Sequence, residues 1–288
     1  LDGQLFSWIR PSWKNTIQLR ESYSESGIVM CVGNKHVESA IATIKIIREM
    51  HESNLPIEIF YTGVKDLKMK NRNRLESISG VKTIDITKII DSNILTIAKS
   101  GVKPFALLVS SFEHAALIDA EVTFLKTPNS LFETNQYLKT GSLFFKDRTI
   151  FKPKDSSLKW FRELLPTKSK FAKSLRIFNG ESAFEQGSGV VVLNKKDHFL
   201  GLLATCVLNA GSFKTETYKN TLREKETFWL GMEIMQESYA FNEQLPGVLG
   251  VVEEKSTEYE VCAKQLLQFD EMGQPFWFTG NVHQQKYS

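Results

Sequence analysis

The chain has 288 residues, of which 42% are hydrophobic, 24% charged and 11% aromatic. This composition excludes collagen-like, low-complexity and disordered chains, and it indicates one large globular domain or two small ones. The 36 Lys and Arg residues nearly balance the 33 Asp and Glu residues, so the formal charge of +3 gives no support to a nucleic-acid partner. No segment approaches the roughly 18 apolar residues of a membrane span. Because the chain opens at Leu1 without a signal sequence, we expect the soluble portion of a longer protein.

The three cysteines, Cys31, Cys206 and Cys262, are scattered along the chain without the Cys-x-x-Cys spacing of a zinc site. One disulfide plus a free thiol is compatible with this number. Cys31 lies inside an apolar run, where a buried thiol is the more frequent outcome. The cysteines therefore do not decide the redox compartment.

In the first half of the chain, apolar runs typical of buried strands alternate with helical periodicity. Residues 27–33 form a continuous apolar run, which predicts a strand buried on both faces. Apolar residues over 35–50 recur at three- and four-residue steps, which predicts an amphipathic helix. The predicted elements that follow are a strand at 57–61, a helix at 66–78, a strand at 81–86, a helical segment at 105–112 and a strand at 115–119. This alternation predicts a parallel α/β sheet.

The second half of the chain has a different pattern. Its predicted elements are strands at 141–145 and 187–193, helices around 157–165, 196–209 and 224–235, and a final strand near 259–269 before an aromatic tail at 275–278. No internal repeat and no linker rich in Pro, Gly or Ser divides the chain. We therefore expect a single two-lobed domain over 26–288, preceded by an N-terminal arm over 1–25.

Two places in this pattern suggest chemistry, because open α/β sheets bind ligands beyond the carboxyl ends of their strands. Gly33 and Asn34 follow the first strand, where a glycine lets a ligand lie against the backbone; Gly-Asn is also ordinary turn chemistry. Asp119 and Glu121 interrupt an apolar run where a strand ends. Such a pair can hold a hard cation such as Mn²⁺ or Mg²⁺, or it can simply face water on an edge strand.

Seven blocks of sequence, in this order, are similar to one known family. They are GIVMCVGN at 27–34, ALLVSSF at 106–112, LIDAEVTFL at 117–125, TGSLFFKDRT at 140–149, EQGSGVVV at 185–192, KETFWLG at 225–231, and QLL with GQPFWFTG within 265–280. Together they resemble the fungal Golgi α-1,3-mannosyltransferases of glycosyltransferase family 71. The resemblance covers nearly all of 27–280.

The resemblance implies a GT-A fold, which is an α/β fold with a Rossmann-like, mostly parallel sheet and a smaller acceptor-side lobe. It implies a retaining α-mannosyltransferase that moves mannose from GDP-mannose to the terminal mannose of an N- or O-glycan, in α-1,3 linkage, with Mn²⁺ as cofactor. Residues 1–25 are then a stem remnant, about 26–125 the nucleotide half and about 126–288 the acceptor half. The family also implies the Golgi lumen and a membrane anchor N-terminal to this chain.

Matched position by position, the resemblance implies roles for individual residues. Asp119 and Glu121 fall on the family's Asp-x-Asp, which grips the metal that bridges the phosphates of the sugar donor. The positions implied to bind the nucleotide sugar are Gly33, Asn34, Lys103, Ser188 and Lys225. The positions implied to be catalytic are Glu185, Gln186 and Glu226. Lys103 is equally compatible with a solvated lysine, and a carboxylate at the position of Glu226 is also favourable at a helix N-terminus.

Two departures from the family pattern favour an alternative function. Glu121 stands where the family usually has Asp, and Gln268 stands where a His is expected as a third metal ligand. A glutamine carbonyl is a poorer partner for Mn²⁺ than imidazole. The alternative is therefore a weak or inactive homologue that binds a glycan or a nucleotide. Trp229 and the aromatic tail either stack on sugars or, more commonly for such residues, form core.

Overall fold

The computed structural model describes residues 6–91, 101–149, 151–255 and 258–280, with backbone alone for 251–255 and 258–264. A six-stranded sheet lies at the centre, in the order β3-β2-β1-β4-β7-β6. Its strands are β1 (Ser24–Cys31), β2 (Ile57–Tyr61), β3 (Val81–Asp85), β4 (Phe112–Ile118), β6 (Ser142–Lys146) and β7 (Gln186–Asn194). The first four strands of the order are parallel, and β7 is antiparallel to β4 and β6. This arrangement confirms the α/β architecture with a mostly parallel sheet that the sequence predicted.

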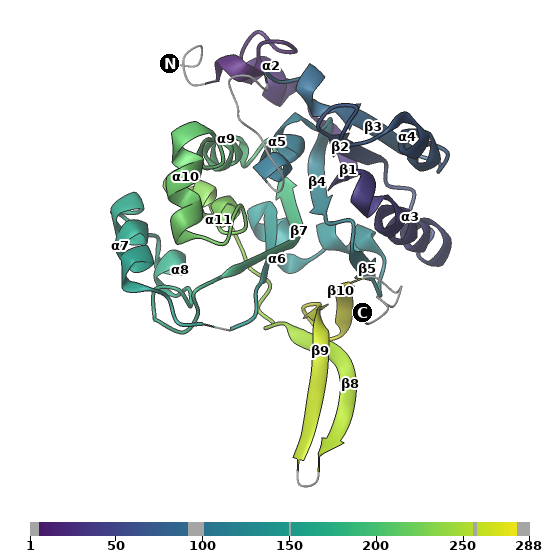
Figure 1. The fold of residues 1–288 in the computed structure, drawn as a ribbon. Helices are drawn as coiled ribbons and strands as arrows, with labels where there is room; N and C mark the ends of the chain where they lie inside the picture. Colours follow the sequence, from purple (N-terminus) through teal and green to yellow (C-terminus); the bar gives the residue numbers. More distant parts are fainter. Residues whose placement is uncertain (1–5, 92–100, 150, 256–257, 281–288) are drawn as a thin grey trace.

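Helices cover both faces of the sheet (Figure 1). One face packs against α3 (Val37–Lys45), its π-helical continuation (Ile46–Met50) and α4 (Met69–Glu76). The other face packs against α5 (Val102–Val109), α9 (Phe199–Leu208) and α11 (Thr227–Ile234). The alternation along β1 explains the two cores, because Val29 joins one core while Ile28 and Met30 join the other.

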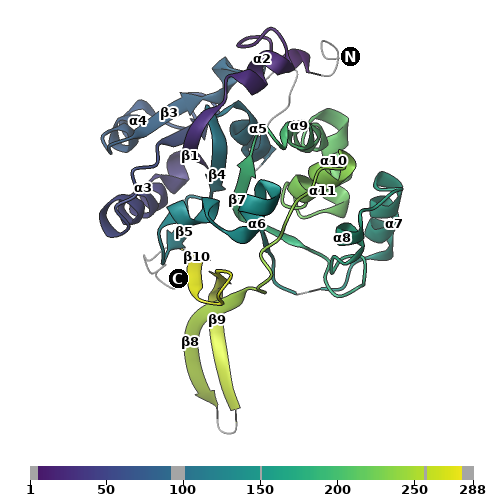
Figure 2. The same ribbon diagram turned by 180° about the vertical axis from the view of Figure 1, so that it is seen from behind.

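The N-terminal segment packs on the α5 face of the sheet (Figure 2). It contains a 3-10 turn (Ser7–Ile9) and α2 (Thr16–Glu21). Trp8 and Leu19 are buried there, and the ring of Trp8 meets that of Phe105 edge-on at 5.3 Å between centroids. Burial of a Trp and a Leu gives this short segment a substantial apolar contact with the sheet domain.

A second, antiparallel sheet has the order β5-β10-β9-β8. Its strands are β5 (Val122–Phe124), β8 (Gly247–Lys255), β9 (Glu258–Phe269) and β10 (Pro275–Thr279). The β8–β9 hairpin projects from the body of the molecule (Figures 1 and 2). Phe276 and Trp277 of β10 are buried in the core beneath α3, so the aromatic tail is core rather than an exposed sugar platform.

The remaining helical elements lie between these strands. They are the 3-10 turns Asn34–His36, Ile86–Lys88 and Pro128–Phe132, and α6 (Asn135–Thr140), α7 (Asp155–Leu164), α8 (Lys170–Lys173) and α10 (Gly211–Asn220). Among the described residues, no helix is long and apolar enough to cross a membrane. Cys31 and Cys206 are free thiols, whereas the side chain of Cys262 lies outside the described residues.

The sequence predictions differ from the structure in a few elements. The predicted helix at 105–112 begins earlier and ends at Val109, because Phe112 already opens β4. The helices and strands that sequence reasoning missed are α2, α6, α8, α10, β5, β8 and β10. In α10 a single residue, Thr217, is buried, so the sequence there has no helical periodicity of apolar residues that would predict a helix.

Candidate functional site

The carboxyl ends of the parallel strands β1, β2 and β4 open onto a cavity of about 730 Å³. Its lining comes chiefly from the segments after these strands: Gly33, Asn34, Lys35 and His36 after β1, Thr62, Lys65 and Asp66 after β2, and Asp119, Ala120 and Glu121 after β4. Cys31, Phe60, Tyr61, Val102, Lys103, Arg223 and Thr279 complete it. The structure therefore brings together five of the predicted site residues: Gly33, Asn34, Lys103, Asp119 and Glu121.

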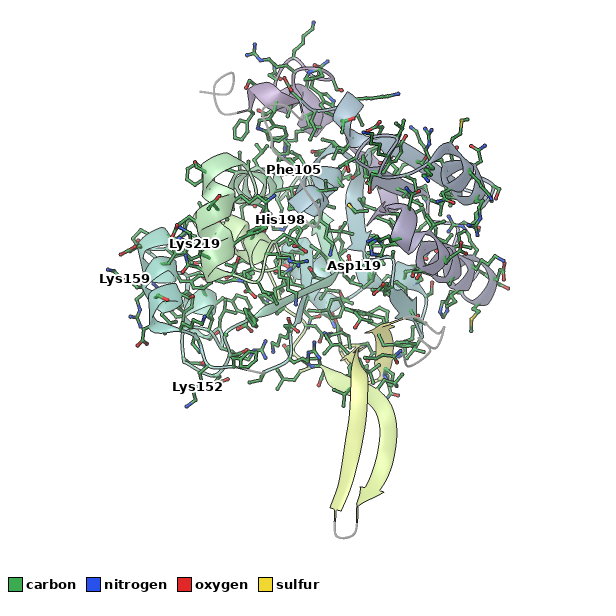
Figure 3. The ribbon with its side chains drawn as sticks, viewed as in Figure 1. Phe105, Asp119, Lys152, Lys159, His198 and Lys219 are labelled. Carbon is green, nitrogen blue, oxygen red and sulfur yellow. The ribbon has the colours of Figure 1, made fainter. Side chains whose placement is uncertain are left out.

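Asp119 and Glu121 lie in the tight connection between the two sheets, and Figure 3 labels Asp119 near the middle of the molecule. The amide of Val122 donates to the carbonyl of Asp119 at 3.1 Å, which closes the turn. Thr43 Oγ1 donates to the carbonyl of Ala120 at 2.9 Å and fixes it. Ala120 is buried, whereas the Asp119 side chain is 36% exposed and Glu121 is exposed. The small residue thus points inward and leaves both carboxylates at the cavity.

Lys103, in the first turn of α5, holds one oxygen of Asp119. Its Nζ lies 2.5 Å from Asp119 Oδ1 and 3.4 Å from Glu224 Oε1. Burial alone would lower the pKa of Lys103, but the two carboxylates raise it above its usual range. Burial, together with the neighbouring carboxylates of Glu224 and Glu121, raises the pKa of Asp119, although the Lys103 ammonium opposes this change. Lys103 is therefore an ion-paired residue of the cavity wall and not a solvated lysine.

Ser188 and Glu224 join this arrangement from behind the cavity. Ser188 Oγ lies 3.4 Å from Lys103 Nζ and donates to Glu224 Oε1 at 3.2 Å. We call Lys103, Asp119, Ser188 and Glu224 the cleft cluster. Sequence reasoning missed Glu224, although it is only two residues before Glu226. The segment before α11 is irregular, and no periodicity in it predicts which glutamate faces Lys103.

Gly33 and Asn34 join the loop after β1 to the loop after β2. A Cβ at Gly33 would lie 2.5 Å from Asp66 Oδ1. A side chain at this position would therefore collide with the Asp66 carboxylate. Asn34 Nδ2 donates to the carbonyl of Lys65 at 3.0 Å, and its Oδ1 accepts from the amide of Lys68 at 3.0 Å. Both residues thus shape the cavity wall through contacts within the protein.

Glu185, Gln186 and Glu226 meet in a second, sealed arrangement. Glu226 Oε1 accepts from the amides of Glu185 (3.0 Å) and Gln186 (3.2 Å), and Oε2 accepts from Trp229 Nε1 at 2.6 Å. Arg176 Nε donates to Glu185 Oε1 at 3.1 Å. We call Arg176, Glu185, Gln186, Glu226 and Trp229 the inner cluster. All five side chains are buried, and none lines the 730 Å³ cavity.

Burial changes the acidity of the inner cluster. It raises the pKa of Glu226 from 4.5 to about 8, and the three N–H donors only partly oppose this change. Trp229 is fully buried and stacks on Phe161 with 5.9 Å between ring centroids. Trp229 is therefore a core residue.

The structure places Lys225 and Gln268 away from the cavity lining. Lys225 Nζ pairs with Asp147 Oδ2 at 2.7 Å. Gln268 is buried and its Nε2 donates to the carbonyl of Lys146 at 2.8 Å, while its Oε1 has no hydrogen-bond partner among the described residues. The side-chain oxygen of Gln268 is thus free to bind, but Gln268 does not line the cavity. Asp119 and Glu121, in contrast, line the cavity after β4.

The donor atoms of Asp119 and Glu121 fit a divalent metal ion. Both are hard carboxylate oxygens, and among the described residues Asp119 Oδ2 has no hydrogen-bond partner while Lys103 holds Oδ1. No group of three or more His, Cys, Asp or Glu residues suited to a metal occurs in the described part of the chain. Two protein ligands leave the other coordination positions of Mn²⁺ or Mg²⁺ to phosphate oxygens and water.

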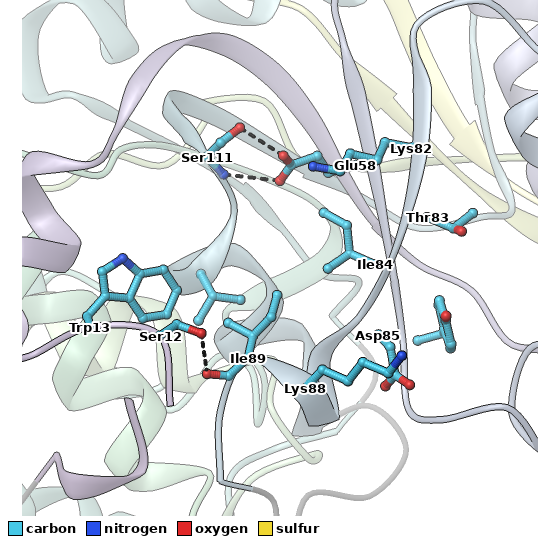
Figure 4. Close-up of a pocket in the computed structure, with 12 residues that line it drawn as sticks. Ser12, Trp13, Glu58, Lys82, Thr83, Ile84, Asp85, Lys88, Ile89 and Ser111 are labelled. Carbon is cyan, nitrogen blue, oxygen red and sulfur yellow. Dashed lines mark hydrogen bonds between the residues drawn. The ribbon is translucent and has the colours of Figure 1, made fainter. Parts of the chain in front are cut away.

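A second cavity of about 470 Å³ lies on the α5 face of β2 and β3 (Figure 4). Glu58 accepts there from the amide (3.1 Å) and the hydroxyl (2.8 Å) of Ser111, and Ser12 Oγ donates to the carbonyl of Ile89 at 2.9 Å. None of the predicted site residues lines it. The candidate site is therefore the cavity at the carboxyl ends of the strands.

Comparison with known families identifies the family of the chain. The family described as "Mannosyltransferase putative" matches residues 25–270. The match covers most of the chain, and the chain belongs to this family. The resemblance to fungal mannosyltransferases that the seven sequence blocks carry is thereby confirmed.

Curated relatives from two yeasts match over most of this chain. "Putative alpha-1,3-mannosyltransferase MNN14" of Candida albicans is 27% identical and matches 85% of this chain and 38% of its own length. The alpha-1,3-mannosyltransferase MNT3 of Saccharomyces cerevisiae is 24% identical, with coverage of 96% and 49%. MNT2 of the same yeast is 23% identical, with coverage of 94% and 54%. The chain therefore spans about half or less of the length of these relatives.

Glycosyltransferases of known structure match this chain with lower sequence identity. Mouse xyloside xylosyltransferase 1 matches with a TM-score of 0.48 and 12% identity over 76% of this chain and 85% of that chain. The mannosyltransferase Ktr4p of S. cerevisiae matches with a TM-score of 0.41 and 12% identity over 74% of this chain and 62% of that chain.

Proposed function

We propose that this chain is the catalytic portion of a retaining α-mannosyltransferase that moves mannose from GDP-mannose to a terminal mannose of a glycan, in α-1,3 linkage. The observation that carries the proposal is the cavity at the ends of β1, β2 and β4, into which Asp119 and Glu121 both face. The family match and the names of the relatives support mannose as the transferred sugar. GDP-mannose as sugar donor and the α-1,3 linkage rest on the sequence blocks.

Asp119 and Glu121 are the residues that would hold Mn²⁺. When bound, this ion would neutralise charge on the departing diphosphate. The chain's own contribution is to orient Asp119: its backbone is held in the turn, and Lys103 holds Oδ1. The assignment of Gln268 as a third ligand stays a prediction, since its carbonyl oxygen is unpaired but its residue is outside the cavity lining.

In the proposed reaction, the bond between the anomeric carbon and the phosphate oxygen breaks and its electron pair stays on GDP. The acceptor hydroxyl oxygen forms the new bond to that carbon, and its proton leaves to a base. Retention requires either two inversions through a covalent intermediate or attack on the same face with help from the leaving phosphate. Lys103 would also place positive charge near the departing diphosphate, which favours its departure.

For the inner cluster we propose a positioning role. Glu226 holds the amides of Glu185 and Gln186 just before and at the start of β7, and Ser188 of the cleft cluster follows two residues later. Glu226 would thus fix the register of the strand that carries Ser188 to Lys103. Direct contact of Glu185, Gln186 or Glu226 with the mannose, and of Lys225 with the nucleotide, stays a prediction.

The proposed setting is the Golgi lumen, with an N- or O-linked glycan as acceptor and a membrane anchor in the longer protein. This part of the proposal rests on the fungal α-1,3-mannosyltransferases that the chain resembles. Linkage analysis of the product after one transfer would test α-1,3 against other linkages.

The central experiment measures transfer from GDP-mannose to an α-mannoside with and without Mn²⁺, for the wild type and for Asp119→Asn. We expect turnover that needs Mn²⁺, and a loss of about a hundredfold or more in Asp119→Asn, because a metal supplies several kcal/mol of charge stabilisation. Glu163→Gln is the matched control, since Glu163 pairs only loosely with Lys159 on exposed α7, at 3.9 Å. Its turnover should equal that of the wild type.

Two outcomes would contradict the proposed function or favour the alternative. Absence of turnover with mannoside acceptors, together with GDP affinity unchanged by Asp119→Asn, would overturn the proposal. GDP binding that is independent of Mn²⁺, without turnover, would instead favour the inactive homologue. The observation that favours this second function is that, in the described part of the chain, no three His, Cys, Asp or Glu residues are grouped so that they could hold a metal ion.

A further inference from the structure

Arg223 lines the 730 Å³ cavity from the segment between α10 and α11, which is remote in sequence from the β1, β2 and β4 loops. Its side chain is exposed to the cavity, and in the described part of the chain its guanidinium has no ion-pair partner. We infer that Arg223 binds the diphosphate of the sugar donor. This inference rests on the proposed function and deepens it.

The backbone of Arg223 supports this inference. Its φ is 60°, a left-handed conformation that residues other than Gly, Asn and Asp rarely adopt. Thr221 Oγ1 donates to the carbonyl of Arg223 at 2.8 Å, and Thr227 Oγ1 donates to the carbonyl of Glu224 at 2.6 Å. Strain of this kind persists where the surroundings enforce it and is concentrated at functional sites. The strained backbone keeps an arginine at the cavity where a glycine would fit more easily.

The neighbours of Arg223 connect it to the cleft cluster. Glu224, the next residue, is buried and contacts Lys103 and Ser188. The segment that presents Arg223 is therefore anchored to the same lysine that orients Asp119. The backbone of Arg223 is held in this way, and its guanidinium lines the same cavity as both carboxylates without being bonded to either in any described contact.

The charges of the cavity favour an anionic ligand. The lining has four basic side chains, Lys35, Lys65, Lys103 and Arg223, against three acidic ones, Asp66, Asp119 and Glu121. A bound divalent cation would add two further positive charges. Arginine is the side chain best suited to a diphosphate, because its planar guanidinium donates two parallel hydrogen bonds to phosphate oxygens.

The test compares binding of GDP, GMP and guanosine by calorimetry in the presence of Mn²⁺. Arg223→Gly and Arg223→Asn are the informative variants, because both residues tolerate the left-handed backbone and should fold at least as well as the wild type. We expect GDP affinity to fall about tenfold to a hundredfold in both, as for a lost hydrogen bond to a charged group. Guanosine affinity should stay unchanged.

Arg223→Lys should recover part of the GDP affinity, since it keeps the charge but not the paired donors. Arg162→Ala on exposed α7 is the control for loss of an arginine elsewhere and should bind GDP as the wild type does. Equal GDP affinity in wild type and Arg223→Gly would overturn the inference while leaving the proposed function intact. A wild type that binds no GDP would contradict the proposed function itself. An equal loss for GDP and guanosine would also overturn the inference, because it would indicate a general distortion of the cavity.

Discussion

The cleft cluster and the inner cluster both include residues of β7, but their carboxylates differ in exposure to solvent and in hydrogen bonding. In the cleft cluster one ammonium, on Lys103, faces two carboxylates, and the Asp119 side chain is open enough to water to meet a ligand. In the inner cluster the carboxylate of Glu226 is sealed, and three N–H groups take up both of its oxygens. A group whose bonding capacity is already used within the protein positions its neighbours, whereas one with an unused oxygen can bind a ligand.

The contrast is sharpest for Glu224 and Glu226, which are two residues apart. Glu224 contacts Lys103 at the back of the cavity, and Glu226 turns away to Trp229 and the start of β7. The two clusters thus separate ligand contact from scaffolding within one short segment. The separation predicts different responses to mutation on the two sides.

Replacement of Lys103 by Met gives the largest expected effect. It leaves Asp119 and Glu224 without their shared cation, and Glu224 is buried. We expect the free energy of unfolding to fall by about 2–3 kcal/mol, less than for a wholly buried pair because Asp119 is partly exposed. Urea denaturation measures the change.

Lys219→Met on α10 is the control for Lys103→Met. Lys219 pairs with Glu216 on the surface at 3.0 Å, so its loss should change stability by no more than about 0.5 kcal/mol. Added Mn²⁺ should restore part of the stability lost in Lys103→Met if Asp119 binds the ion. Equal effects of the two substitutions would remove the distinction between a ligand-facing and a surface ion pair.

The inner cluster should respond to pH. Because burial raises the pKa of Glu226 from 4.5 to about 8, the folded state binds a proton that the unfolded state has released between these values. The stability from this proton is fully present below about pH 4.5 and is lost as the pH rises through about 8. Between pH 6.5 and 7.5, the free energy of unfolding should fall by up to about 1.4 kcal/mol from this group.

Glu226→Gln tests the assignment, since it keeps the shape but cannot titrate. Its unfolding free energy, from denaturation at several pH values, should fall less steeply than that of the wild type over the same interval. Parallel curves would show that the three N–H donors keep Glu226 ionised and that burial does not dominate.

The sequence predicted the sheet domain and brought several candidate residues to one cavity because both predictions depend on local patterns. Apolar runs gave β1, β2 and β4, and residues that follow parallel strands must meet at one edge of the sheet. That rule brought Gly33, Asn34 and Asp119 to one cavity without any knowledge of packing.

The remaining features depend on contacts between distant segments. Arg223 and Glu224 lie in an irregular turn whose direction is set by hydrogen bonds from Thr221 and Thr227. Glu226 is sealed in part by the amides of Glu185 and Gln186, just before and at the start of β7, which lie 41 and 40 residues earlier in the chain. A local sequence pattern cannot indicate contacts between segments this far apart. The sequence therefore identified candidate residue types but not the residues with which they pair.

The smallest expected effect is that of Gly33→Ala in the cavity wall. The backbone there, with φ of −103° and ψ of 172°, suits any residue, so the added methyl group acts through its approach to Asp66 Oδ1 at 2.5 Å. Asp66 would have to move and weaken the bonds that its Oδ2 accepts from the amide and hydroxyl of Thr62, at 2.9 and 3.0 Å. We expect the free energy of unfolding to fall by about 1 kcal/mol.

The control for Gly33→Ala is the same substitution in an Asp66→Ala background. The methyl group has room there, so Gly33→Ala should cost much less, and a double-mutant cycle measures the difference. Additive effects would mean that the cost of the added methyl group does not arise from its approach to Asp66.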